Sequence, residues 1–594
     1  MGTWALSALL AVIIAGVFTV LDLVRLDRGR DEENSLAVSL GVGVGVFVLL
    51  LFVNFLLLFF GRPAMVGPWN GWLWITMPAL IALTVFFCRA IAQERWWSAA
   101  LVVPGGFMAL WVLWAGFSVA FTPFGEGSAK LFASQVNLVK ADEGDYPPTD
   151  ADHILQVPQE AALFKARQAI ASVPDQPNLS TQYKPGAPVL QSVNNHLYWI
   201  FQLTLVGWRV ANQVDAVVPG FIVVDAEDPN AQSEVKTGHR MNYSDGAPFG
   251  HALHRHIYTH GYRHWKINDL TLEIDDNWQP FFTASLNKPV KNFAGSAPQK
   301  MIIVNPETGE ITEYALDKIP EWVDRVYSQS VAVDFLTWWG QWGNAPWKFW
   351  FPNQANRTQP AGTPHLVYTK GQHPSWQILI TSMNNDTSAI GVVMFEGRSN
   401  KATFYSVPGI TIESAALKAF QTSNENLKSF VPVHPSIHSI YGELTWTVAY
   451  ISTDANTDGA EPFQAIGFLH TKHTDGASVS MAVDKASALA KYRQRIARGN
   501  SNAAPEEGGL TKTVQGTVTN MVTLVITGNT NYLIKLDAFP QRIFQGAARD
   551  DDFDLPFIKQ GDQVVITYLD IGKPRVDISS ISIIAPSAST PLAR

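Results

Sequence analysis

The residues best suited to chemistry lie in one histidine-rich segment. Six of the 14 histidines fall within residues 239–264, and three of them, His256, His260 and His264, are four positions apart. On a helix this spacing places the imidazoles on one face, where two of them can bind one zinc ion. No glutamate occupies the position of an HExxH base, and Gly261 weakens the helix between the ligands. The three histidines are therefore candidate metal ligands without a catalytic base.

Basic residues within the same segment favour a different ligand. Arg240, His254, Arg255 and Arg263 would together repel a divalent cation, but they suit an anion such as a phosphate headgroup or an envelope polymer. Because imidazoles gain charge near pH 6, such a contact could also depend on pH. A third interpretation is a polar face packed within the fold. Metal binding, anion binding and packing all remain open.

Aromatic residues crowd the segment from Trp322 to Phe351. Large rings near glycines and a proline can form a buried core, or an exposed platform for a sugar, a membrane surface or a protein. Trp347 and Trp350, which flank Lys348, are the candidate binding residues for an exposed platform.

Motifs of common catalytic sites are missing from the sequence. It contains no P-loop, no dinucleotide glycine fingerprint and no GxSxG elbow, and the only cysteine, Cys88, lies in an apolar stretch. We therefore predict no catalytic residue and no cofactor. The 43 basic and 51 acidic residues give a net charge of -8, which repels a phosphate backbone and disfavours nucleic acid as a partner.

Four N-terminal apolar stretches approach the ~20 residues that span a bilayer: Thr3–Val24, Leu36–Phe60, Trp72–Ala92 and Ser98–Thr122. They predict a four-helix transmembrane anchor over residues 1–124. Five arginines in the first and third loops, against one in the second, place those two loops in the cytoplasm. The expected location is thus the bacterial cytoplasmic membrane, as a multi-pass protein in contact with the lipid bilayer. Its N-terminus and large C-terminal region would be extracytoplasmic.

Beyond a predicted linker at residues 125–150, one pattern recurs along the chain. A helical segment precedes an apolar strand, a connection, a second apolar strand and a turn. This predicts four α+β repeats, over residues 151–265, 266–350, 351–425 and 426–498.

The clearest patches of the repeat are YWIFQLT followed by FIVVDAEDPN, and Met301–Tyr314 (MIIVNPETGEITEY). A strand that ends in Val-Asn or Val-Asp before a Pro/Thr-Gly turn is similar to the PepSY type of bacterial extracytoplasmic repeat. The resemblance implies binding or regulatory modules, and it carries over no catalytic residue.

After a second linker at residues 499–510, five short strands predict a small barrel over residues 511–594 that resembles an OB-fold. Such barrels often bind single strands through a basic groove with stacked aromatic rings. The eight basic and eight acidic residues from Leu510 onward cancel, so a protein or glycan contact is favoured over nucleic acid.

The expected fold class is an N-terminal α-helical membrane anchor followed by α+β repeats and a small all-β C-terminal barrel. The expected function is non-enzymatic: binding or scaffolding in a bacterial cell-envelope assembly. Its partners would be membrane or envelope proteins, an anionic envelope polymer and further copies of the chain. The alternatives are a metal-dependent envelope hydrolase that uses the His239–His264 cluster, and cell-surface binding of nucleic acid through the barrel.

Overall fold

The computed structural model describes residues 126–584 apart from short gaps, which are 150–153, 174–175, 177, 292–293, 344–346, 349–350, 353–354, 369–372, 384–387, 424–429, 453–460, 500–509, 527–528, 548–554 and 571–573. The described residues divide into two compact units. Unit 1 lies within Met1–Tyr146 and Asp152–Ile410, and unit 2 within Pro147–Ala151 and Thr411–Arg594.

The predicted four-helix membrane anchor, residues 1–124, lies outside the described residues. Among the residues that are described, no helix has both the length and the apolar composition needed to cross a bilayer, and the fold is mostly β-sheet. The expected fold class is therefore wrong, as is the multi-pass location in a bacterial cytoplasmic membrane that rests on it. Both depend on the length of apolar runs, which does not by itself distinguish a bilayer span from another buried segment.

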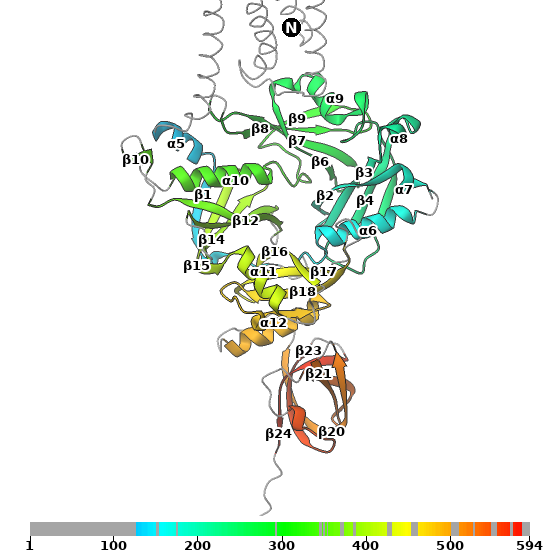
Figure 1. Cartoon of the computed structure of the whole chain (residues 1–594), viewed down its shortest axis with the longest axis vertical. Helices are drawn as coiled ribbons and strands as arrows, with labels where there is room; N and C mark the ends of the chain where they lie inside the picture. The colour runs from blue at the N-terminus through cyan, green and yellow to red at the C-terminus, as the bar shows by residue number, and fades with distance from the viewer. Residues whose placement is uncertain are drawn as a thin grey trace, which may run out of the picture. The chain divides into compact units, whose positions relative to one another are not determined.

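Four β-meanders recur along the chain, and we call them modules 1 to 4 (Figure 1). Module 1 contains β2 (Tyr183–Val193), β3 (His196–Leu205), β4 (Val218–Asp225) and β5 (Glu234–Met241). Module 2 contains β6 (Lys266–Ile274), β7 (Pro280–Lys288), β8 (Ala297–Val304) and β9 (Ile311–Ala315). Module 3 contains β12 (Thr358–Val367), β13 (Ser375–Ser382), β14 (Ser388–Glu396) and β15 (Lys401–Thr411). Module 4 contains β16 (Phe430–Ile440), β17 (Glu443–Ser452), β18 (Phe463–His470) and β19 (Ser480–Ala482).

A helix precedes each meander: α6 (Gln159–Ala171), α9 (Leu253–Thr259), α10 (Gln329–Trp338) and α11 (Glu413–Thr422). Helix α6 packs against β2 and β4 through small apolar residues such as Ala162 and Ala166, whereas α10 packs against β12 and α11 against β16. The Ser328 side chain caps α10 by accepting a hydrogen bond from the Val331 amide. Helix α12 (Lys485–Gly499) follows module 4 and packs against β18 and β19.

The remaining elements are short and lie between the modules or before them. The predicted linker 125–150 contains α5 (Glu126–Ala133) and β1 (Asn137–Asp142), and β1 adds to module 3 as a parallel neighbour of β15. The others are α7 (Leu179–Gln182), α8 (Trp208–Gln213), the π-helical turn η7 (Trp339–Gly343), β10 (Trp347–Lys348), β11 (Phe351–Pro352) and several 3-10 turns.

The first strand of every module breaks its register with the second strand at one place. In module 1 the shift lies between Pro185 and Pro188, and in modules 3 and 4 it includes Pro364 and Pro435. Proline has no amide hydrogen to donate, so it is tolerated where the ladder of hydrogen bonds is already interrupted. The irregularity is a shared feature of the four modules rather than a local defect.

The chain enters the helix of each module by the same hydrogen bonds. Amides of the segment that leads to the helix donate to a carbonyl just after the third strand, which belongs to Ala226, Pro306, Gly397 or Thr471 in modules 1 to 4. In module 2 these amides, of Asn242 and Tyr243, are separated from α9 by a 3-10 turn, Phe249–His251. In three modules a tryptophan on the second strand also donates its indole N–H to this entry segment. The pairs are Trp199 with the Val157 carbonyl (2.8 Å), Trp376 with the Tyr327 carbonyl (2.8 Å) and Trp446 with the Thr411 hydroxyl (2.9 Å). Module 2 has Phe282 at this place, because Phe282 pairs with Val304 as each tryptophan pairs with the third-strand residue two before the accepting carbonyl.

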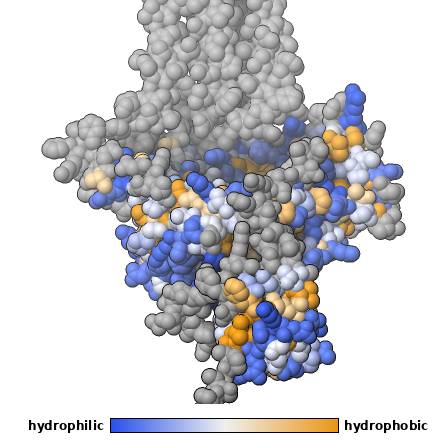
Figure 2. All heavy atoms as spheres, turned by 60° about the horizontal axis from the view of Figure 1, so that its bottom comes forward, coloured by the Kyte–Doolittle hydropathy of each residue, from blue (hydrophilic) through white to orange (hydrophobic). Residues whose placement is uncertain are grey.

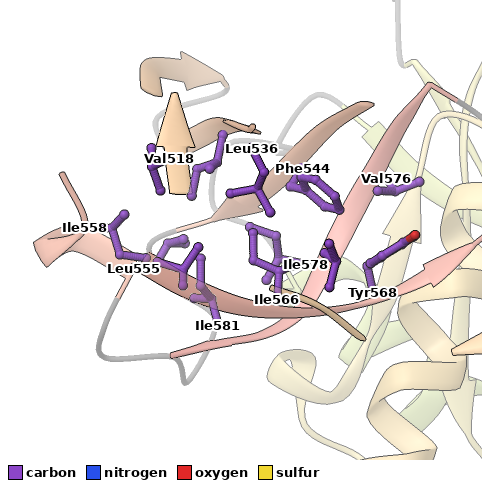
Figure 3. Packing of buried hydrophobic residues seen from close by; sticks show 13 residues of the cluster. Val518, Leu536, Phe544, Leu555, Ile558, Ile566, Tyr568, Val576, Ile578 and Ile581 are labelled. Carbon is purple, nitrogen blue, oxygen red and sulfur yellow. The ribbon is translucent and has the colours of Figure 1, made fainter. Parts of the chain in front are cut away.

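A closed five-stranded barrel follows in unit 2, with strand order β20-β21-β22-β24-β23. Its strands are β20 (Leu510–Ile526), β21 (Asn529–Leu536), β22 (Phe539–Ala547), β23 (Gln563–Asp570) and β24 (Arg575–Ile583). The long β20 pairs with β23 along its first half and with β21 along its second half, while β22 runs parallel to β24. Inward side chains from these strands, with Leu555 and Ile558, fill the core (Figure 3).

Candidate functional site

The three candidate metal ligands do not share one helix face. Helix α9 ends at Thr259, Gly261 adopts a φ of 109°, and His264 belongs to a separate 3-10 turn, η6 (Tyr262–His264). Because glycine reaches positive φ without steric cost, Gly261 ends the helix that the spacing predicts. No group of three or more side chains able to hold a metal ion occurs among the described residues.

His256 instead packs against a turn, with the exposed His260 beside it. Their rings lie 4.0 Å apart, and the ring of Tyr243 lies 4.1 Å from that of His256. The His256 Nε2 atom is 2.7 Å from the Gly309 carbonyl oxygen in the β8–β9 turn. Burial lowers the pKa of His256, so its ring favours the neutral form that a packing role requires. Of the three histidines, His256 is thus buried and hydrogen-bonded within the fold, whereas His260 and His264 are exposed.

The four candidate anion-binding residues come from three different elements. Arg240 is exposed on β5, His254 and Arg255 lie in α9, and Arg263 lies in η6, where its Nε donates to the His264 ring at 3.4 Å. Of the two predicted platform residues, Trp347 belongs to β10, but its side chain is outside the described part of the structure, as is Trp350 altogether.

Pockets, rather than a broad apolar surface, are the main candidate binding features. On the face shown in Figure 2, hydrophilic residues predominate over the described surface and hydrophobic residues form small patches among them. A pocket of about 750 Å³ lies in the barrel, within the usual range of ligand sites. Its lining comes from the start of β20, from the β21–β22 turn with the start of β22, and from Tyr568 and Pro574 near the β23–β24 connection.

Two cations and two rings dominate this barrel pocket. Arg542 and Lys512 line it with the exposed ring of Phe539, and no acidic residue is among the lining residues. The guanidinium of Arg542 donates to the Tyr568 hydroxyl at 2.7 Å and lies 5.2 Å from the centre of that ring. Tyr568 is 2% exposed and belongs to the barrel core, at one edge of the cluster in Figure 3. The arginine is therefore held in place by a rigid part of the fold.

Asp537, which directly precedes the pocket residue Ala538, is hydrogen-bonded to backbone amides. Its Oδ1 atom accepts hydrogen bonds from the amides of Thr517 and Ala538, both at 2.7 Å, and these bonds lower its pKa. The barrel sequence contains as many acidic as basic residues, but the charged residues that line the pocket are all basic. A guanidinium fork, an ammonium group and an exposed ring suit an anion that also presents an apolar or aromatic surface.

A second polar feature is a buried network where modules 1, 2 and 3 meet in unit 1. Its central carboxyls are Glu273, 0% exposed, and Asp324, 5% exposed. Glu273 accepts from the Asp324 amide and the Thr283 hydroxyl, both at 3.1 Å, and Asp324 accepts from the Tyr368 hydroxyl at 2.9 Å. Burial raises the pKa of Glu273 to about 8 and that of Asp324 to about 6. Perturbed carboxyls can mark function, but these are shielded and tie strands together.

Comparisons with known proteins leave the chain unassigned. No family model matches it, and no curated protein matches it. Among solved structures, the comparison gives a B. megaterium levansucrase mutant with 9% sequence identity and a TM-score of 0.17. The match covers 74% of this chain and 97% of that chain. A similarity of this size carries no argument about fold or function.

Proposed function

We propose that this chain is a non-catalytic binding protein, in which the repeated modules form a scaffold and the barrel binds an anionic polymer. The observation that carries the proposal is the barrel pocket, because it combines Lys512 and Arg542 with the exposed ring of Phe539 and is lined by no acidic residue. Charge complementarity of this kind favours encounter with an anion and orients it once bound.

The scaffold part of the proposal rests on how the modules are joined. Residues from modules 1, 2 and 3 share the buried network around Glu273 and Asp324, and the Ser192 amide of module 1 donates to Asp324 at 2.9 Å. Shared buried hydrogen bonds resist relative movement of the modules, since breaking one leaves a buried polar group without its partner. The resemblance of the repeats to PepSY-type modules agrees with binding rather than catalysis.

The barrel proposal is tested with the full chain and fluorescently labelled poly-L-glutamate, by fluorescence anisotropy. We expect Lys512→Gln and Arg542→Gln each to weaken binding about tenfold, or about 1.4 kcal/mol, because each variant removes one charged contact. Binding should also weaken as salt is raised. Lys535→Gln, on the exposed side of β21, removes the same charge outside the pocket and should leave binding unchanged.

Other outcomes would reject the proposal in distinct ways. Equal losses from Lys512→Gln and Lys535→Gln would show only a general charge effect. Tighter binding of oligothymidylate than of poly-L-glutamate, with the same sensitivity to Arg542→Gln, would replace the proposal with single-strand binding through the barrel, for which a basic aromatic groove is typical.

A further inference from the structure

A second pocket, of about 250 Å³, lies in module 2. Its charged lining residues are acidic, whereas those of the barrel pocket are basic. Three rings line it: Phe281 on β7, Tyr314 on β9 and Trp322 in the segment before α10. Two carboxylates, Asp275 and Glu310, also line it, together with Ile303, Asn305, Thr312 and Pro320. No lysine, arginine or histidine is among these lining residues.

Two turns at one end of the sheet give this module 2 pocket a fixed rim. Asp275 accepts hydrogen bonds from the amides of Asn277 (2.9 Å) and Gln279 (2.7 Å) in the β6–β7 turn. Asn305 does the same in the β8–β9 turn, where it accepts from the amides of Glu307 (2.9 Å) and Thr308 (3.2 Å). Side chains that are already held by their own turns lose little freedom when a ligand binds.

Neighbouring modules hold the segment that carries Trp322, one of the three pocket rings, in place. The rings of Phe281 and Trp322 lie 5.3 Å apart at 33°. Gln191 of module 1 donates to the Trp322 carbonyl at 3.3 Å. Arg398 of module 3 donates to three carbonyls of the same segment, those of Ile319, Glu321 and Val323, at 2.7 to 3.0 Å. The pocket is thus preformed within unit 1.

We propose that the module 2 pocket binds a small organic cation, such as a quaternary ammonium group. Aromatic faces attract a cation through the ring quadrupole, and the attraction is stronger where water is displaced. Asp275 and Glu310 add an attraction of the same sign. Arg398, the cation that holds the segment of Trp322, is directed at backbone carbonyls and lies 3.7 Å from the Glu321 carboxylate, which offsets its charge.

The test compares choline with its neutral isostere, 3,3-dimethyl-1-butanol, by calorimetric titration of the full chain. Both probes present the same apolar shape, so a difference between them reports the positive charge. We expect choline to bind at least fivefold more tightly. Glu310→Gln should reduce choline affinity threefold to tenfold, and Trp322→Leu at least fivefold, because each removes one attractive group.

Strand β9 offers a matched control. Successive side chains of a strand point to opposite faces, so Thr312 and Tyr314 face the pocket while Glu313 faces away and pairs with Lys300. Glu313→Gln removes the same charge three residues after Glu310, from the opposite face of β9, and should leave choline affinity unchanged.

Three results would overturn the proposal: no choline binding, equal affinity for the neutral isostere, or equal losses from Glu310→Gln and Glu313→Gln. The first two would favour a neutral ligand such as a sugar, which glucose titration would detect. If Trp322→Leu does not fold, the exposed Glu310→Gln variant decides the matter alone.

Discussion

Glu273 and Asp324 show how single buried residues set the pH response of unit 1. Both carboxyls are removed from water where three modules meet, and burial raises their pKa values to about 8 and about 6. Arg325 lies close enough to both to oppose the shifts, and its Nε and Nη2 atoms are shielded from solvent without a hydrogen-bond partner among the described residues. The folded state therefore binds protons that the unfolded chain releases between about pH 4 and pH 8.

The raised pKa of Glu273 predicts how the stability of unit 1 changes with pH. Where the folded state binds more protons, the free energy of unfolding falls as pH rises, so unit 1 should lose stability from about pH 4 to pH 8. Glu273→Gln keeps an acceptor for the Asp324 amide and removes the titration. We expect the variant to be more stable than the wild type at pH 8.5 and to depend less on pH, as measured by thermal unfolding. A variant less stable at pH 8.5 would contradict the assignment.

The element that recurs along the chain is a helix followed by a four-stranded meander, not a pair of strands. Each module joins a helix to a four-stranded meander through the entry segment that precedes the helix, and modules 1, 3 and 4 reinforce this joint with an indole hydrogen bond. A histidine–carboxylate contact between the start of the second strand and the end of the third recurs with the two residue types exchanged: His196 with Asp225 (2.9 Å) in module 1, and Glu443 with His470 (3.2 Å) in module 4. The second and third strands are therefore linked at the same place in both modules, by a histidine and a carboxylate that have changed places.

Trp199→Phe tests the importance of this joint. Trp199 is 5% exposed, and its indole satisfies the carbonyl of Val157, itself 0% exposed. Phenylalanine keeps an aromatic ring but leaves the carbonyl without this donor, so we expect a loss of about 1–3 kcal/mol in the free energy of unfolding. Chemical denaturation measures the loss. Trp265→Phe, at a partly exposed position, should change stability by no more than about 0.5 kcal/mol.

At the scale of the whole molecule, Glu273 and Asp324 in unit 1 and His438 in unit 2 respond to pH in opposite directions. In unit 2, burial lowers the pKa of His438 to about 4, and its Nε2 atom lies 3.0 Å from the Ser436 hydroxyl. The unfolded chain then binds the proton first, so this histidine reduces stability as pH falls from about 6.5 to about 4. Glu273 and Asp324 increase the stability of unit 1 over much of the same range.

Differential scanning calorimetry of the full chain should separate these contributions. Between pH 7 and pH 5 we expect Glu273 to shift the unfolding transition of unit 1 upward and His438 to shift that of unit 2 downward. Glu273→Gln and His438→Gln should each reduce the shift of one transition only. If both variants alter the same transition, the division into two independently responding units is wrong.

The amino-acid sequence determined the local features of the modules. Apolar runs rich in β-branched and aromatic residues mark the second and third strands, so the patch YWIFQLT lies within β3, and the first four residues of Met301–Tyr314 lie within β8. The first strands of modules 1, 3 and 4 were missed because Pro185, Pro188, Pro364 and Pro435 are typical of loops, and only a register shift accommodates them. The predicted helix face of His256, His260 and His264 failed because a glycine at positive φ ends α9.

Only the tertiary structure decided where the binding features lie. Gln191 and Trp322 are 131 positions apart, and Arg542 and Tyr568 are 26 apart, yet each pair is hydrogen-bonded. Charge and composition are sums along the chain, whereas a pocket depends on which strands pair. The barrel sequence is neutral from Leu510 onward, but its pairing gathers cations on one pocket, while the meander of module 2 gathers carboxylates and rings on another. The physical reason is that contacts between distant strands are made by folding, which local patterns do not encode.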